Sequence, residues 1–144
     1  MRKLLFPALL LVLTASCSAP RLYYWGSNGT PTKYEQLAYL QSEKQTPKSI
    51  CDLVCLYEDM VSHPGGTRKT PPPGICAEYG YLLLQPETAE AFEKHATDKQ
   101  KRMFGYTDYG VSFHELGIAM LQKEIELYPE AEKFIGPLLK RLKG

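Results

Sequence analysis

Residues 75–84, ICAEYGYLLL, and residues 111–129, VSFHELGIAMLQKEIELYP, decide the fold of this chain. Both stretches repeat apolar side chains at the three- and four-residue spacing that places them on one face of an α-helix. Each stretch also carries an interior glycine, Gly80 in the first and Gly117 in the second. Because glycine weakens a helix, these two residues predict a point where the backbones of the two helices approach closely.

The pair of helices resembles a tetratricopeptide repeat. In that repeat a glycine of the first helix admits the second helix, and a proline follows the end of the second. Gly80 fits the first helix, and Gly117, Leu121 and Pro129 keep the spacing of the second. Glu124 departs from the repeat, which has a small residue there. The two glycines are also far apart in sequence, whereas a regular repeat places about 12 residues between these positions.

An inserted helix over residues 87–104 explains that extra length, because it lies between the two helices of the hairpin. Two further helices precede them, and each has a start signal: Thr32 with Glu35 forms a capping box, and Thr46 precedes Pro47. No stretch alternates as a strand does, so the predicted class is all-α, built of αα-hairpins. The predicted helices cover 33–44, 47–62, 73–84, 87–104, 111–128 and 130–142.

The first 16 residues are typical of a secretory signal. Arg2 and Lys3 precede an apolar run from 4 to 13, and small residues follow it. The run is shorter than the roughly 20 residues that span a bilayer. Cys17 directly follows Leu-Thr-Ala-Ser, which resembles the lipobox of bacterial lipoproteins. An ordinary signal cleaved near Ala15 is the alternative, and it would leave Cys17 as a free thiol.

Lipidation of Cys17 predicts a membrane-anchored protein, because two or more acyl chains anchor a domain stably. Ser18 follows the cysteine, so the aspartate that retains enteric lipoproteins in the inner membrane is absent. We therefore expect an outer-membrane anchor and a domain that faces the periplasm, with the inner membrane and the cell surface as alternatives. The predicted organisation is a cleaved signal at 1–16, an extended lipidated segment at 17–32 and a helical domain at 33–144.

The charge of the mature chain gives no reason to expect a nucleic-acid partner. Loss of Arg2 and Lys3 from the 17 basic residues leaves 15, against 16 acidic residues. The two signs are interspersed, whereas nucleic-acid-binding domains carry a basic stripe or patch.

Three cysteines remain after Cys17: Cys51, Cys55 and Cys76. An odd number allows at most one intramolecular disulfide. Cys51 and Cys55 lie one helical turn apart, where disulfide geometry is rarely met, so a bridge would join Cys76 to Cys51 or Cys55. The alternative is that all three pack as small apolar side chains. The Cys-x3-Cys spacing does not match a zinc site, and we predict neither a metal nor a cofactor.

The sequence carries no recognisable catalytic motif, and we predict no catalytic residue. His114-Glu115 begins like a zinc-protease helix, but Ile118 stands where the second histidine is required. One enzymatic idea survives, in which Cys76 at the start of a helix has a lowered thiol pKa and acts as a nucleophile. That idea also needs a histidine base within reach.

Tyr23, Tyr24 and Trp25 form an aromatic cluster six to eight residues beyond Cys17. Such side chains anchor partner contacts and also favour the membrane interface. A third interpretation is that they fold back onto the helices. Because Gly26 and Asn28-Gly29 predict a defined turn, we favour packing on the core or on a partner.

The whole mature chain resembles the DUF4810 family of small bacterial lipoproteins. The likeness covers about residues 17–143, with 85–110 as extra length. It is carried by the lipidated cysteine, by Tyr-Tyr-Trp-Gly at 23–26, by Pro-Pro-Gly at 72–74 and by Leu-Tyr-Pro-Glu at 127–130. The family has no established enzymatic activity. Its members are typically encoded beside a lipoprotein related to the curli secretion channel protein CsgG and beside a further small lipoprotein.

The resemblance therefore implies a component of an envelope lipoprotein assembly, with CsgG-related lipoproteins as partners. Stacks of helical hairpins offer surfaces for partner polypeptides, which favours a scaffold or protein-interaction function. The alternatives are an assembly or chaperone factor for a CsgG-like secretion channel and, third, a thiol-dependent enzyme.

Overall fold

The computed structural model describes residues 19–144, so the predicted signal and Cys17 lie outside the described residues. Over that range the chain is all-α, as predicted, with seven α-helices and no strand. The α-helices are α2 (Lys33–Lys44), α3 (Pro47–Ser62), α4 (Ile75–Leu83), α5 (Pro86–His95), α6 (Asp98–Phe104), α7 (Tyr109–Leu127) and α8 (Glu132–Lys143), and the 3-10 helix η1 (Pro129–Ala131) precedes the last.

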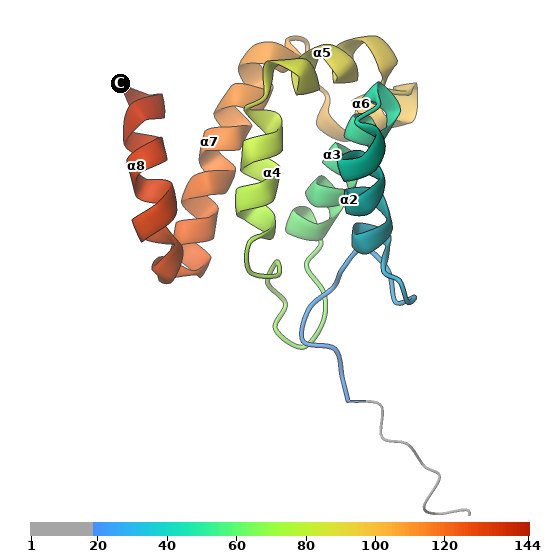
Figure 1. Cartoon of the computed structure of the whole chain (residues 1–144), viewed down its shortest axis with the longest axis vertical. Helices are drawn as coiled ribbons and strands as arrows, with labels where there is room; N and C mark the ends of the chain where they lie inside the picture. The colour runs from blue at the N-terminus through green and yellow to red at the C-terminus, as the bar shows by residue number, and fades with distance from the viewer. Residues whose placement is uncertain (1–18) are drawn as a thin grey trace, which may run out of the picture.

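Five of the helices stand side by side in the order α2, α3, α4, α7, α8 (Figure 1). Helix α5 lies across one end of this row and packs on α3, α4 and α7. Residues 19–32 and the loop 63–74 lie together at the opposite end. We call this second region, together with the start of α2, the end of α3 and the start of α4 beside it, the N-terminal end of the domain. The two ends of the row are therefore built from different segments.

The capping signals place α2 and α3 where the sequence predicts them. The side chains of Thr32 and Thr46 each accept a hydrogen bond from the backbone N–H three residues on. In return, the backbone N–H of each threonine donates to the side chain of Glu35 or Ser49. These reciprocal bonds satisfy N–H groups that the first turn of a helix leaves without partners. Local chemistry is therefore enough to start both helices.

The close approach predicted at Gly80 and Gly117 is confirmed. A Cβ at Gly80 would lie 2.8 Å from the carbonyl oxygen of Gly117, and one at Gly117 would lie 3.1 Å from that of Gly80. Helices α4 and α7 form the most extensive helix pair of the domain. The hairpin that decides the fold is thus closed at the two glycines, with the insertion between its arms.

The insertion consists of two helices, so the single helix predicted over 87–104 is wrong. Helix α5 ends at His95, and Ala96 is extended with ψ 140°. Thr97 then caps α6 by bonding reciprocally with Gln100. The sequence carries this second start signal, and it outweighs the helical pattern of the surrounding residues.

The other bounds differ from prediction by a few residues. The helix predicted over 73–84 begins at Ile75 because Gly74 is left-handed, with φ 89°. The helix predicted over 111–128 begins at Tyr109, since Asp108 caps it. The last helix, predicted over 130–142, divides into η1 and α8, and Pro137 lies inside α8.

The core has two parts. The larger runs from α3 through α4 and α5 to the start of α7, and an aromatic group of α5, α6 and α7 fills it. The smaller joins α8 to α7 through Leu121, Ile135 and Leu139. Each Å² of apolar surface that is buried contributes about 25 cal/mol, so these core contacts are the main source of stability.

Candidate binding groove

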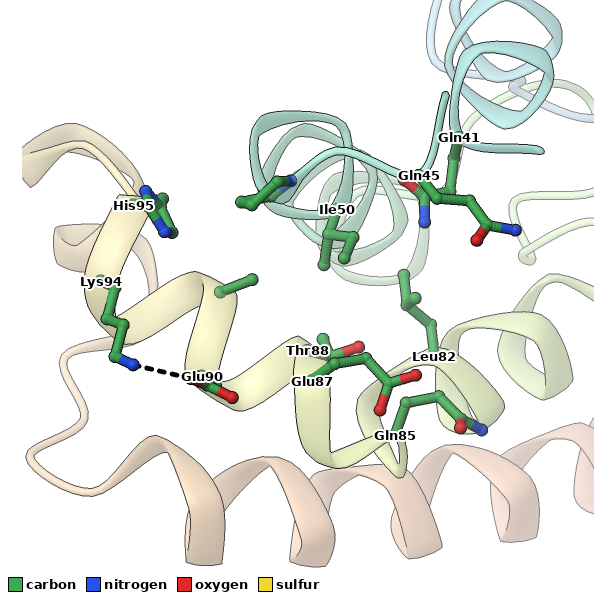
Figure 2. Close-up of a pocket in the computed structure, with 12 residues that line it drawn as sticks. Gln41, Gln45, Ile50, Leu82, Gln85, Glu87, Thr88, Glu90, Lys94 and His95 are labelled. Carbon is green, nitrogen blue, oxygen red and sulfur yellow. Dashed lines mark hydrogen bonds and ion pairs between the residues drawn. The ribbon is translucent and has the colours of Figure 1, made fainter. Parts of the chain in front are cut away.

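A groove of about 490 Å³ lies at the α5 end of the helix row (Figure 2). Its volume falls in the range of ligand pockets, roughly 300–1,000 Å³. The end of α2, the start of α3, the end of α4 and the whole of α5 form its walls. The lining residues are Gln41, Gln45, Pro47, Ile50, Leu82, Gln85, Glu87, Thr88, Glu90, Ala91, Lys94 and His95.

The floor of the groove is apolar and its rim is rich in amides. Ile50 and Ala91 are buried, and Leu82 is half-buried beside them. Gln45 and Gln85 stand exposed at the rim. Ligand sites typically combine an apolar lining with a few polar groups that orient the ligand. This groove has that composition.

Thr88 carries an unpaired hydroxyl inside this groove. The residue is completely buried, and its Oγ1 has no hydrogen-bond partner in the described part of the chain. Thr88 lies in the first turn of α5, where no helical carbonyl stands four residues earlier to accept its proton. Nearly all buried polar atoms in proteins are paired, so an orphan hydroxyl in a groove marks a place for a ligand atom.

Two of the amides make one internal hydrogen bond each. Gln41 Oε1 accepts from the Ser49 hydroxyl at 2.5 Å, and Gln85 Nε2 donates to the Tyr81 carbonyl at 3.2 Å. These bonds fix the side chains and use one of the two amide atoms in each. A ligand in the groove would therefore meet an N–H donor from Gln41 and a carbonyl acceptor from Gln85.

The charged residues of the groove lie at its outer margin. Lys94 Nζ lies 2.6 Å from Glu90 Oε1, and both side chains are more than half exposed. Such a pair contributes little to stability, about 0–1 kcal/mol. The interior of the groove thus carries hydrogen-bonding groups without net charge.

The aromatic cluster predicted at Tyr23, Tyr24 and Trp25 lies at the N-terminal end of the domain. Trp25 packs on Tyr34 with ring centroids 5.2 Å apart, and Tyr34 in turn contacts Tyr57. The Tyr24 hydroxyl donates to the Gly26 carbonyl at 2.9 Å. Tyr24 and Trp25 therefore fold back onto the helices, and neither lies in the groove.

Backbone bonds hold this segment on the loop 63–74. The N–H groups of Thr67 and Arg68 donate to the carbonyls of Arg21 and Leu22, each at 3.0 Å. A Cβ at Gly66 would lie 2.4 Å from the Leu22 carbonyl oxygen, so glycine is required there. The loop 63–74 therefore holds the N-terminal segment, residues 19–32, on the domain.

Tyrosine hydroxyls at this end donate to carboxylates. Glu78 Oε2 accepts from Tyr34 and from Tyr57, both at 2.7 Å, and Glu58 accepts from Tyr79 at 2.8 Å. Burial, reinforced by these carboxylates, raises the pKa of Tyr57 and Tyr79 well above its usual range. The sequence shows no spacing that predicts this network.

Of the two interpretations of the cysteines, the disulfide between Cys76 and Cys51 or Cys55 is not seen: all three are free thiols in the structure. Their neighbours explain this: Cys51 Sγ lies 3.5 Å from the Ala91 carbonyl of α5, whereas the thiol of Cys76 is influenced by Glu124 of α7. Cys51 and Cys76 are buried and Cys55 is half-buried. Packing as small apolar side chains accounts for the two buried thiols.

The lowered thiol pKa expected for Cys76 is wrong in direction. Burial, and then the Glu124 carboxylate, raises the pKa of Cys76 to about 12. Burial likewise raises the pKa of Cys51 to about 11 and that of Cys55 to about 12. Thiols with such pKa values stay protonated near neutral pH, so they are poor nucleophiles.

Glu124, which departs from the repeat pattern, caps α4 from a neighbouring helix. Its carboxylate accepts from the N–H of Gly74 at 2.7 Å and from that of Ala77 at 3.3 Å. The side chain is buried, with an exposed fraction of 3%. Gly74 has no side chain to cap the helix, so a carboxylate at the positive end of the helix dipole supplies the missing acceptor.

No group of three or more metal-binding side chains occurs within residues 19–144. No helix in that range is long and apolar enough to span a membrane. Models of protein families, curated proteins and solved structures were all compared with this chain, and none matches it. The likeness to the DUF4810 family therefore rests on the residues quoted for it.

Proposed function

We propose that this protein is a lipid-anchored envelope lipoprotein that binds a partner polypeptide in the groove beside α5. The observation that carries the proposal is the buried, unpaired hydroxyl of Thr88 at the base of an amide-lined groove. A buried hydroxyl without a partner costs about 1–3 kcal/mol, and a ligand atom that pairs with it would recover this energy.

A polypeptide segment fits the chemistry of this groove. Its backbone N–H and C=O groups complement the open amide atoms of Gln41 and Gln85, and an apolar side chain would cover Ile50 on the floor. Peptide-binding proteins typically combine backbone hydrogen bonds for affinity with apolar pockets for specificity. The expected partner is an envelope lipoprotein, of the CsgG-related type that the family resemblance implies.

Photo-crosslinking in cells that produce the lipidated protein tests the proposal. A benzophenone amino acid replaces the exposed Glu87 at the groove, and a matched variant carries it at the exposed Lys140 on α8. We expect one protease-sensitive adduct from position 87 and none from position 140. Mass spectrometry should identify the adduct as an envelope lipoprotein.

Thr88→Val, added to the groove probe, should lower the adduct yield several-fold, because the valine cannot pair with the ligand. Thr107→Val removes an exposed hydroxyl outside the groove and should leave the yield unchanged. An equal adduct from position 140, an adduct that resists protease, or a yield that Thr88→Val does not alter would contradict the proposal.

A further inference from the structure

We propose that the N-terminal end of the domain rests on an anionic phospholipid bilayer through a basic tip formed by Arg21, Leu22, Arg68 and Lys69. This inference rests on the lipid anchor of the proposed function. It adds an orientation: the basic tip faces the bilayer, and α5, whose residues line the groove, lies at the far end of the helix row (Figure 1).

The length of chain before Arg21 brings the basic tip to the bilayer. Only four peptide units separate Cys17 from Arg21. Fully extended, that stretch spans at most about 14 Å. A lipid on Cys17 would therefore hold Arg21 and Leu22 near the headgroups.

Basic side chains outnumber acidic ones around the tip. Residues 1–34 and 60–77 contain no aspartate or glutamate. Arg21, Arg68 and Lys69 are exposed, and the ion pairs that the structure describes lie at other residues. Glu35 is the acidic side chain that senses Arg21, whose positive charge helps to lower the pKa of Glu35 after the two hydrogen bonds from Thr32. Arg68 and Lys69 make no ion pair within residues 19–144, and the Arg21 guanidinium donates to the Ser27 carbonyl at 3.4 Å. Arg68 and Lys69 are therefore the cations most available to phosphate groups.

The backbone bonds of the N-terminal segment make the tip a fixed surface. Because the Arg68 N–H donates to the Leu22 carbonyl, the two segments that supply the cations are bound to each other. The Leu22 side chain is 55% exposed and stands among the cations. An apolar side chain within a basic cluster is the combination that binds the interface of an anionic membrane.

Each cation near an anionic surface strengthens binding about fivefold at moderate salt, which corresponds to about 1 kcal/mol. The effect extends about 8 Å at physiological ionic strength. Neutralising Arg68 and Lys69 together should therefore lower the ratio of bilayer-facing to freely tumbling domains about 25-fold.

The experiment uses the lipidated mature protein in two kinds of vesicle, phosphatidylcholine alone and phosphatidylcholine with phosphatidylglycerol. A nitroxide attached at Thr67→Cys reports whether the tip is shielded from a water-soluble relaxation agent. The Arg68→Gln/Lys69→Gln variant is compared with Lys99→Gln/Arg102→Gln, which removes two exposed cations of α6.

We expect shielding of the label only in vesicles that contain phosphatidylglycerol. The shielding should disappear at high salt and in the Arg68→Gln/Lys69→Gln variant, while the α6 control retains it. Equal shielding in both vesicles, or equal loss in both variants, overturns the inference. If the protein does not float with vesicles at all, Cys17 is not lipidated and the proposed function itself fails.

Discussion

At the N-terminal end of the domain, polar groups form hydrogen bonds with other groups of the same chain. The Arg21 and Leu22 carbonyls accept from the loop 63–74, and Glu78 accepts from two tyrosines. At the α5 end, by contrast, the buried Thr88 hydroxyl has no partner in the described residues. One end is complete in itself, and the other lacks a hydrogen-bonding group that a ligand could supply.

At the N-terminal end the polar groups form hydrogen bonds within the chain. At the α5 end one buried hydroxyl is left for which a second molecule could supply the partner. The lipid anchor that we propose at Cys17 would leave residues 19–32 beside the membrane, and their backbone bonds to the loop 63–74 would hold the domain close to it. A binding groove needs polar atoms that are desolvated and unpaired until the ligand arrives.

Alkaline pH should give the largest effect, and it should act first at the N-terminal end. Folding raises the pKa of the buried Tyr57 and Tyr79 above the ordinary value of 10.0, so their contribution to stability is complete below pH 10 and is lost above it. Each group costs about 1.4 kcal/mol per pH unit in that range. Tyrosinate absorbance and residue-resolved NMR should show α3 and α4 losing structure together with tyrosine ionisation.

A stable fold well above pH 11 with tyrosines already ionised would contradict this picture. The Thr88 hydroxyl does not ionise in this pH range, so Thr88→Val should not change the pH of the alkaline transition. Glu78→Gln removes one carboxylate that disfavours tyrosinate, and it should lower the pKa of Tyr34.

Gly66→Ala should come next, with a loss of about 3 kcal/mol in the free energy of unfolding. Gly66 has φ 75°, and a Cβ would strike the Leu22 carbonyl. Gly105→Ala is the matched control, because Gly105 has φ 66° but nothing within 4 Å. The control should cost about 1–2 kcal/mol through backbone strain alone. Urea unfolding measures the free energy of unfolding of both variants. Equal losses would show that the contact between Gly66 and the N-terminal segment adds no stability.

Glu124→Ala should cost about 2 kcal/mol, because it leaves the N–H groups of Gly74 and Ala77 unpaired at a buried helix end. Glu126→Ala, an exposed change on the same helix, should cost less than about 0.5 kcal/mol. Thermal unfolding compares the two variants. A Glu124 variant as stable as the control would remove the capping role of this residue.

Thr88→Val should give the smallest effect and the opposite sign. Replacing an unpaired buried hydroxyl with a methyl group of similar shape should stabilise the free protein by about 1 kcal/mol. Thr46→Val removes a hydroxyl that caps α3 and should destabilise by about 1 kcal/mol. If both variants lose stability in urea unfolding, the Thr88 hydroxyl has a partner and the contrast between the two ends fails.

Much of the fold could be predicted from the sequence, because its signals are local. Thr32 and Thr46 start their helices within three residues, and the interior glycines at 80 and 117 announce a close helix pair. Thr97 with Gln100 carries an equally local signal that divides the inserted helix, and the helical pattern around it masked that signal.

The groove could not be predicted, because its residues meet only in the folded chain. Gln41 and Gln85 come from segments more than 40 residues apart, and no signal in either segment predicts that the two lie together. Glu124 could be recognised in sequence only as a misfit in a repeat. Its capping role depends on Gly74, which lies 50 residues away in the sequence but within hydrogen-bond distance in the fold.

The most direct test of the central claim is fluorescence quenching by headgroup-labelled lipid in membranes that carry the mature protein. One fluorophore is attached at Thr67→Cys on the loop 63–74 and another, in a separate sample, at Glu87→Cys on the groove rim. We expect strong quenching at position 67, little at position 87, and loss of membrane association in Cys17→Ser. Quenching at position 87 as strong as at position 67, or a Cys17→Ser protein that stays on the membrane, would contradict it.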